Sequence, residues 1–232
     1  MSDFTVYYWP APFRGEFPRA VLAHAGADWT EAGTDATADM MGREVADQPV
    51  PFMAPPLIHD SKHGVYISEM PAILAYLGDR FGLLPANGHH AALTHKIIAD
   101  SNDILDEITC DGGREMWTAD KWAEYEPRLA RWMQIFEETG RRHGLTADAG
   151  HMLGTDAPGL ADLVTYSLWY TMTDKLPPLA EQLEQHAPSV AALCRRLSAS
   201  EALTRLREWS DAEFGDIYCG GQIEASLRDV LS

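Results

Sequence analysis

Cysteine is scarce in this sequence, which contains three among its 232 residues. Cys110, Cys194 and Cys219 lie far apart and are odd in number, so they match neither the spacing of metal ligands nor a disulfide framework. Buried, unreactive thiols are the simplest interpretation of such isolated cysteines. The scarcity argues against a disulfide-stabilised secreted scaffold and favours a reducing compartment, and we expect no bound metal.

Long apolar runs are also missing. The most apolar stretches are short or interrupted by charge, so the sequence predicts no membrane span. The N-terminal residues do not show a basic segment followed by an apolar one, which is the pattern of a secretory signal. We therefore expect a cytoplasmic protein that does not act at a membrane.

Positive charge is in short supply. The sequence has 18 Lys and Arg residues against 35 Asp and Glu residues, which gives a net charge of −17. A surface of this sign repels nucleic acid and anionic membranes, so neither is expected as a partner. Solubility is the simplest reason for the acidity, and an anionic substrate would need a local positive site.

The first third of the chain alternates strand and helix patterns. β-branched and aromatic stretches predict strands, and apolar residues at intervals of three and four predict helices. The expected elements are strand 4–9, helix 14–25, strand 29–33, helix 37–45, strands 57–59 and 65–67, and helix 69–81. This order implies a mixed sheet with helices packed on it, because parallel neighbours need helical crossovers.

Strand signals disappear after residues 82–88, a segment with one proline and two glycines that is typical of a linker. The expected helices that follow are 91–110, 121–143, 160–173, 178–185, 189–198 and 201–209. The strongly apolar helix 160–173 carries Trp169 and Tyr170 and is predicted to lie at the centre of a bundle. We therefore expect an α/β domain over residues 1–82 followed by an all-helical domain over residues 90–232.

Two prolines mark the entry to the strand at 57–59. Proline has no backbone N–H, so Pro55 and Pro56 belong at the first position of a strand or at a sheet edge, where backbone groups stay free. Ser68 and Glu69 follow the next strand and open a helix, whose N-terminus carries unpaired N–H groups that suit a carboxylate. A free backbone edge beside such a cradle is typical of a site for a small anionic peptide.

Several motifs, in this order and spacing, resemble the cytosolic glutathione transferase superfamily. They are Tyr7-Tyr8-Trp9-Pro10 with Phe13-Arg14-Gly15-Glu16, Ala54-Pro55-Pro56-Leu57, Ser68-Glu69-Met70-Pro71, and the segment 151–162. The first is similar to the tyrosine-type classes such as pi and sigma, here in a bacterial-looking sequence of unassigned class. The resemblance covers nearly the whole chain and implies a thioredoxin-like first domain, a helical second domain and a homodimer.

The resemblance implies a transferase that activates the thiol of glutathione for attack on electrophiles, in detoxification. Tyr8 is similar to the catalytic tyrosine, whose hydroxyl would stabilise the thiolate. The position that holds a serine or cysteine in other classes is Ala11, which disfavours those chemistries. Tyr7 is adjacent and should point to the opposite face of the strand. The alternative is that both tyrosines are strand-forming aromatics without chemistry.

The resemblance also implies how glutathione, the co-substrate, is held. The backbone of Ala54, beside Met53 and before an expected cis-proline at Pro55, should pair with the cysteinyl group. The Glu69 carboxylate and the N–H of Met70 should hold the γ-glutamyl end, although the family usually has Ser or Thr at position 70. Further expected contacts come from Phe13 and Arg14, and from Asp103, or alternatively Asp100, across a dimer. Arg43 is an alternative to Arg14 for the glycyl carboxylate.

The electrophile pocket is expected between the two domains. Met116, Trp117 and Trp169 are the residues assigned to its wall, although aromatic residues at helical spacing are more often plain core. Two alternative functions stay open. One is a non-catalytic binding or scaffold protein that keeps the fold, which Met70 favours. The other is a glutathione-dependent isomerase or lyase of the same fold, since apolar acceptor residues carry little information about the reaction.

Overall fold

A four-stranded mixed sheet forms one layer of the fold. The computed structural model describes residues 2–232, and the strands lie in the order β2-β1-β3-β4. The first strand, β1 (Phe4–Tyr7), is parallel to β2 (Trp29–Glu31) and antiparallel to β3 (Leu57–Asp60). The remaining strand, β4 (Val65–Ser68), pairs antiparallel with β3 and forms one edge of the sheet. The predicted strands are therefore present, each within a few residues of its expected bounds.

The strand that follows the two prolines lies inside the sheet. Leu57, its first residue, is in register with Tyr7 on one side and with Ser68 on the other. The expectation of a free β-edge on this strand is therefore wrong, because both of its edges are paired. Pro55 and Pro56 lie just ahead of the strand, where their missing N–H groups remove nothing from the ladder.

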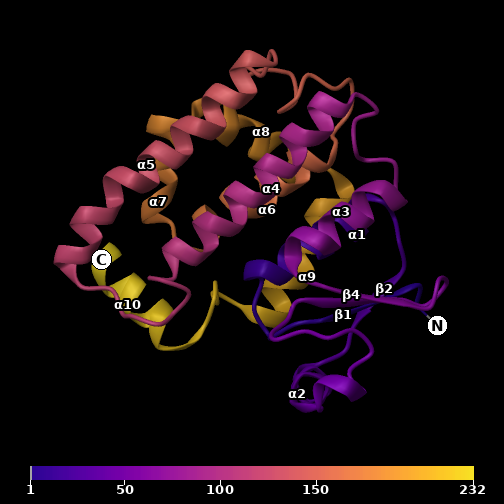
Figure 1. Cartoon of the computed structure of the whole chain (residues 1–232). Helices are drawn as coiled ribbons and strands as arrows, with labels where there is room; N and C mark the ends of the chain where they lie inside the picture. Colours follow the sequence, from indigo (N-terminus) through magenta and orange to yellow (C-terminus); the bar gives the residue numbers. More distant parts are fainter. Residues whose placement is uncertain (1) are drawn as a thin grey trace.

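Helices cover both faces of the sheet. One face packs against α1 (Phe13–His24) and α3 (Met70–Arg80), and α2 (Thr34–Gly42) lies on the other side (Figure 1). A short 3₁₀ turn, Val45–Asp47, follows α2, so the helix predicted at 37–45 begins and ends three residues earlier than expected. The order β-α-β-α-β-β-α matches the predicted thioredoxin-like arrangement.

The rest of the chain is helical. Its elements are α4 (Gly88–Ile108), α5 (Ala119–Arg142), α6 (Leu160–Lys175), α7 (Pro178–His186), α8 (Pro188–Ser198), α9 (Glu201–Phe214) and α10 (Gly221–Leu231). All but the last were predicted. The apolar spacing of Ile223, Leu227 and Val230 is the signal from which the last helix is recognisable.

The central helix of this part is α6, as its apolar sequence predicts. It contacts α1, α4, α7 and α8, and nearly all of its side chains are buried (Figure 1). Its start is fixed by Asp162, whose carboxylate accepts the N–H of Gly159 at 2.9 Å and that of Met152 at 2.7 Å. Glycine offers no side-chain oxygen, so only the acidic half of a capping box is made. A Cβ on Gly159 would lie 3.2 Å from the carbonyl oxygen of Leu83, which explains the glycine.

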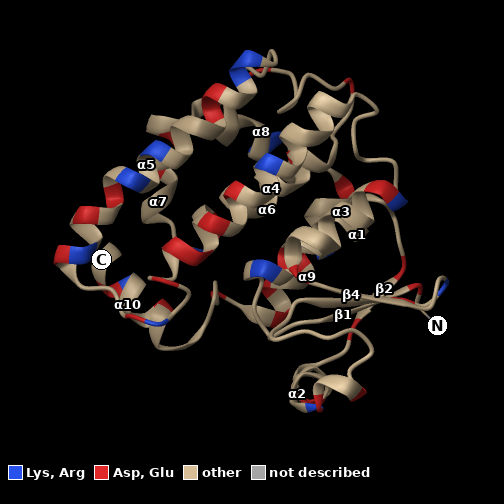
Figure 2. Ribbon diagram, in the orientation of Figure 1, with Lys and Arg blue, Asp and Glu red and all other residues tan. Residues whose placement is uncertain are grey.

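Charged side chains are spread over the outer surfaces of the helices, with both signs mixed along α5 (Figure 2). Within residues 2–232, no helix is long and apolar enough to cross a membrane. In the same part of the chain, no group of three or more His, Cys, Asp or Glu side chains is arranged to hold a metal ion.

Helix α1 carries a buried ion cluster where the sheet meets α9. The Arg19 guanidinium is fully buried and donates to the Glu31 carboxylate at 2.9 and 3.1 Å. Glu16 lies one turn earlier, 3.6 Å from the same guanidinium, and one of its carboxylate oxygens has no hydrogen-bond partner within the described residues. Burial raises the pKa of Glu16 from 4.5 to about 7, because the charged form loses its hydration and Arg19 only partly compensates.

This pKa predicts a loss of stability with rising pH. The folded state binds a proton at Glu16 more tightly than the unfolded chain does, so the stability from Glu16 is complete below pH 4.5 and falls as the pH rises through about 7. A difference of about 2.5 units corresponds to about 3 kcal/mol. Relative to the native protein, Glu16→Gln should therefore gain about 2–3 kcal/mol between pH 5 and pH 8 in urea unfolding.

Glu44→Gln, which removes an exposed carboxylate, is the matched control. Parallel pH profiles for the native protein and Glu16→Gln would show that the Glu16 carboxyl does not titrate in this range.

Candidate active site at the end of the first strand

Tyr8 comes directly after β1 and is only 6% exposed. Its phenol oxygen accepts the backbone N–H of Arg14, in the first turn of α1, at 3.3 Å. Burial raises the pKa of Tyr8 to about 12, although the charges of Arg14 and Arg19 oppose the shift. The phenol therefore stays protonated at neutral pH, and its hydrogen is available to a ligand that can accept it.

Gly15 allows the ring of Tyr8 to lie against α1. A Cβ on Gly15 would be 2.4 Å from Cδ1 of Tyr8 and 2.9 Å from Nη1 of Arg19, which is closer than real Cβ contacts come. The guanidinium of Arg19 also lies 5.7 Å from the centre of the Tyr8 ring. The helix thus fixes the position of the ring as well as that of the hydroxyl.

Phe13 and Arg14, two of the predicted binding residues, lie beside Tyr8. Phe13 begins α1 with a φ of +32° and packs edge to face on Tyr218 at 5.3 Å. The guanidinium of Arg14 lies 5.0 Å above the Phe13 ring. Tyr7 is the last residue of β1, and its pKa is raised by burial and by the neighbouring phenol of Tyr66.

The segment before β3 departs from the expected geometry. The cis peptide bond joins Pro55 to Pro56, so the cis residue is Pro56 and the expectation of a cis bond at Pro55 is wrong. Met53 is 85% exposed and Ala54 is exposed, whereas both prolines are buried. Only Ala54 among these last three residues before the strand has an N–H, so Pro55 and Pro56 offer a ligand their carbonyls alone.

Glu69 and Met70 lie at the start of α3. Glu69 precedes the helix with a φ of +71°, which is rare for a residue other than glycine, and its side chain is exposed. Met70 is the first helical residue, and its side chain is 1% exposed within the core. Met70 therefore presents only its backbone N–H at the helix end, where the following Pro71 removes one competing donor.

Of the remaining charged residues, Asp103 and Arg43 are exposed and Asp100 is partly buried. Asp103 lies on the exposed side of α4, and Asp100, one turn before it, is paired with Lys96. Arg43 lies just after α2 and pairs with Asp39 at 2.8 Å. Within one chain these residues are not drawn into the cluster around Tyr8.

A cavity of about 500 Å³ lies between the end of α4 and the start of α5. Its wall includes Glu107, Cys110, Trp117, Lys121, Tyr125 and Arg128. Trp117 was predicted to line an electrophile pocket between the two domains; it lies in this wall, whose residues all belong to the helical part. Met116 is its neighbour and is 36% exposed.

Trp169 was assigned to the same pocket, and the structure places it elsewhere. The side chain is fully buried at the centre of α6 and packs edge to face on Phe136 at 5.5 Å. It belongs to the core, as an apolar helix at the middle of a bundle requires. Sequence reasoning missed Cys110, Tyr125 and Tyr218, because only the fold brings three such distant positions towards one end of the helical part.

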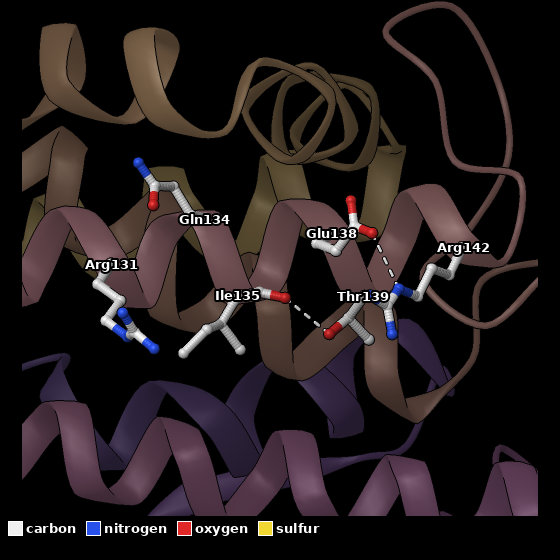
Figure 3. A pocket seen from close by; sticks show the side chains of 6 residues that line it. All are labelled: Arg131, Gln134, Ile135, Glu138, Thr139 and Arg142. Atoms are coloured by element: carbon white, nitrogen blue, oxygen red, sulfur yellow. Dashed lines mark hydrogen bonds and ion pairs between the residues drawn. The ribbon is translucent and has the colours of Figure 1, made fainter.

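A second cavity, of about 420 Å³, follows the outer side of α5 (Figure 3). Its lining residues are Arg131, Gln134, Ile135, Glu138, Thr139 and Arg142. Glu138 is paired with Arg142 at 2.9 Å, and the Thr139 hydroxyl donates to the carbonyl of Ile135 at 2.7 Å (Figure 3). These contacts stay within one helix, and the lining residues include no pairing of a nucleophile with a base.

Comparison with known proteins gives one family and one fold. A family model described as glutathione S-transferase, C-terminal domain, matches residues 93–230, which is more than half of the chain. No curated protein sequence matches the chain.

Three solved structures share the fold at low sequence identity. The structure of NaGST-2 has a TM-score of 0.69 at 17% identity, covering 90% of this chain and 97% of that one. A Nu-class GST from Haemonchus contortus has a TM-score of 0.68 at 20% identity, with the same coverage of 90% and 97%. An orthorhombic crystal structure of NaGST1 has a TM-score of 0.70 at 19% identity, again covering 90% and 97%.

The close approach of α1 to Tyr8 can be tested at Gly15. Its backbone is helical, so Gly15→Ala adds a methyl group without backbone strain, and the cost comes from overpacking against Tyr8 and Arg19. We expect a loss of about 1–3 kcal/mol in urea unfolding.

Gly88, the first residue of α4, is the matched control, because a Cβ there meets no atom within 4 Å. Gly88→Ala should leave stability unchanged or raise it by up to about 1 kcal/mol. Equal stability of the two variants would refute the close contact at Tyr8.

Proposed function

Because this chain belongs to the glutathione S-transferase family, we propose that it is a glutathione transferase of the tyrosine type. In this proposal Tyr8 donates a hydrogen bond to the sulfur of glutathione and stabilises its thiolate. The observation that carries the proposal is the buried, protonated phenol of Tyr8, held by the N–H of Arg14 at 3.3 Å. The thiolate then attacks an electrophile in the cavity lined by Trp117 and Tyr125.

Hydrogen bonding at Tyr8 can supply the free energy that lowers the pKa of the glutathione thiol. Moving a thiol pKa from about 8.5 to about 6.5 requires about 2.7 kcal/mol in favour of the anion. A hydrogen bond to a charged group contributes about 1.5–3 kcal/mol, and a buried site strengthens it. The Arg14 N–H that points at the phenol oxygen polarises the Tyr8 hydroxyl and makes it a better donor.

Glutathione would lie along the segment before β3 and the start of α3. Ala54 supplies the N–H for the cysteinyl backbone, and Pro55 can add only a carbonyl. Glu69 would bind the ammonium of the γ-glutamyl group, and the N–H of Met70 its carboxylate. Because the Met70 side chain is buried, this end of the ligand receives one hydrogen bond fewer than a Ser or Thr would provide.

The same proposal extends to the location, the assembly and the domain roles of the protein. We expect a cytoplasmic detoxifying homodimer in which Asp103 of one subunit reaches the ammonium bound by the other. The glutathione-binding domain would comprise residues 1–82, and the domain that contributes the electrophile pocket would comprise residues 90–232.

A second candidate function is a non-catalytic binding protein. One observation favours it: the buried side chain of Met70, which offers no hydroxyl at the start of α3. Titration calorimetry with glutathione, followed by a conjugation assay, separates the two. Binding without turnover would favour this second function. Turnover in which the product contains no glutathione would instead indicate an isomerase.

The role of Tyr8 predicts a large and specific loss. Tyr8→Phe keeps the ring and removes the hydroxyl, so the pKa of bound glutathione should rise by about 2 units. The kcat for conjugation with a chloronitrobenzene should fall about 50-fold near pH 6.5, and the ultraviolet absorbance of the thiolate should show the shifted pKa.

Tyr7, the preceding residue, is the natural control, and Tyr7→Phe should change kcat less than twofold. An unchanged rate in Tyr8→Phe would remove that phenol from the mechanism.

The role of Glu69 can be tested with a modified ligand. Glu69→Gln removes the charge that would pair with the ligand ammonium, so the dissociation constant for glutathione should rise about 5- to 30-fold, or about 1–2 kcal/mol. With glutathione lacking the α-amino group, the native protein and Glu69→Gln should bind equally in calorimetry. A similar loss with both ligands would indicate that the substitution only disturbs the start of α3.

A further inference from the structure

A small polar cavity lies where α1 packs against α6 and α9. It has room for about 10 Å³ of solvent, which is close to the space that one water molecule needs. Its inner wall is formed by buried polar side chains from all three helices. They are Glu16 of α1, Tyr166, Thr171 and Lys175 of α6, and Ser210 of α9. A cavity of this size and polarity suits a single ordered water.

The Glu16 carboxyl lines this cavity and has an oxygen without a partner. Within residues 2–232, Oε2 of Glu16 makes no hydrogen bond, although the residue is only 5% exposed. Nη1 of Arg19 lies 3.6 Å from this oxygen, which is beyond hydrogen-bond distance. A buried carboxyl oxygen has lost its hydration, so a water within reach lowers the free energy of the folded state.

Three hydroxyls of the same wall are also without a partner. Thr165 and Ser167, elsewhere on α6, donate to carbonyls one turn earlier, as buried hydroxyls in a helix often do. The hydroxyls of Tyr166, Thr171 and Ser210 form no such bond in the described part of the chain, although all three residues are buried. Each hydroxyl can both donate and accept. One water in the cavity would therefore serve the carboxyl and hydroxyls together.

The cations around the cavity already have hydrogen-bond partners. Arg19 donates to both carboxylate oxygens of Glu31 on the side of the sheet. Lys175 donates to the Asp211 carboxylate at 2.5 Å. The other titratable groups that line the cavity are Tyr166, Tyr170 and Asp174 of α6 and Arg207 of α9. Burial, only partly opposed by Arg19 and Lys175, therefore raises the pKa of Glu16 to about 7.

The proton on Glu16 affects Tyr8 through Arg19. Nη1 of Arg19 donates to the carbonyl of Ala11, in the loop between Tyr8 and α1, at 2.9 Å. The same nitrogen is the one that lies 3.6 Å from Oε2 of Glu16. A neutral Glu16 leaves this nitrogen to Ala11, whereas an ionised Glu16 competes for it with a stronger, charge-assisted hydrogen bond. The loop leads into the turn of α1 whose Arg14 N–H binds the Tyr8 hydroxyl.

We propose that Glu16 is a positioning residue for the transferase reaction: its protonated carboxyl donates to one ordered water in this cavity, which leaves Arg19 to hold the loop after Tyr8. This inference rests on the proposed transferase function. The water accepts the hydrogen of the carboxyl and donates its own hydrogens to hydroxyl oxygens of α6 and α9. When Glu16 gives its proton to solvent, the carboxylate draws Arg19 away from Ala11, and the Tyr8 hydroxyl loses its alignment with the thiolate.

The pH profile of kcat tests this proposal, with a chloronitrobenzene as the electrophile. In the native protein, kcat should rise as the bound thiol ionises and then decrease as Glu16 ionises near pH 7. In Glu16→Gln the amide stays neutral, so the decrease should be absent and kcat near pH 8 should exceed the native value about fivefold. Glu44→Gln, at an exposed carboxylate, should keep the native profile.

A native profile without the decrease, or the same decrease in Glu16→Gln, would overturn the proposal. A role of Glu16 in stability alone would change the free energy of unfolding and leave the shape of the kcat profile of the folded protein as it is.

A measurement without glutathione separates this inference from the proposed function. The Arg19 guanidinium lies 5.6 Å from the centre of the Trp209 ring, so a movement of Arg19 changes the surroundings of that ring. Tryptophan fluorescence of the native protein should therefore change with a midpoint near pH 7. The change should be absent in Glu16→Gln and reduced in Trp209→Phe. A missing midpoint would refute the proposal whether or not the protein conjugates glutathione, whereas a midpoint without conjugation would contradict the proposed function alone.

The water itself can be observed directly. A high-resolution crystal structure near pH 6 should show one water within about 3.2 Å of Oε2 of Glu16. Direct contact of that oxygen with a protein donor in place of water would overturn the proposed bridge.

Discussion

The buried guanidinium of Arg19 is the contact on which the site depends. It donates to the carbonyl of Ala11 at 2.9 Å, in the loop after Tyr8, and to the carboxylate of Glu31 in β2 at 2.9 and 3.1 Å. Its flat faces lie near the aromatic rings of Tyr8, Trp209 and Phe214, at 4.8 to 5.7 Å. A buried charge is tolerated only when such partners surround it. One side chain therefore joins the loop after β1, the sheet and α9.

Because Arg19 connects these elements, the candidate site combines residues from distant parts of the chain. Tyr8 and Phe13 come from the sheet and α1, whereas Tyr218 reaches them from the segment after α9. The anchors of the two parts are different: an amide of α1 holds the Tyr8 hydroxyl, and the Glu224 carboxylate holds the backbone of Tyr218. The result is a contact between Phe13, at the start of α1, and Tyr218, which needs both parts of the fold to be in place.

Most elements could be predicted from local pattern, because burial on one face leaves a periodic trace in the sequence. The helix expected at 69–81 is observed at Met70–Arg80, and the apolar helix predicted at 160–173 is observed at Leu160–Lys175. Helix α10 was not predicted, although the spacing of Ile223 and Leu227 indicates it. Trp169 was assigned to a pocket because an aromatic residue looks the same in sequence whether it lines a cavity or fills a core.

By itself the sequence determined the order of strands and helices, the two-part architecture, and the place of Tyr8 near the end of the first strand, because these follow from local propensity and spacing. Only the tertiary structure decided that β3 is an inner strand, that Pro56 is the cis residue, and that the side chain of Met70 is buried. It also decided that Tyr218 packs on Phe13, since the two residues are 205 positions apart in the chain. The reason is physical. Strand pairing, the peptide isomer and side-chain burial depend on contacts between residues that are distant in the chain, and the local sequence does not determine those contacts.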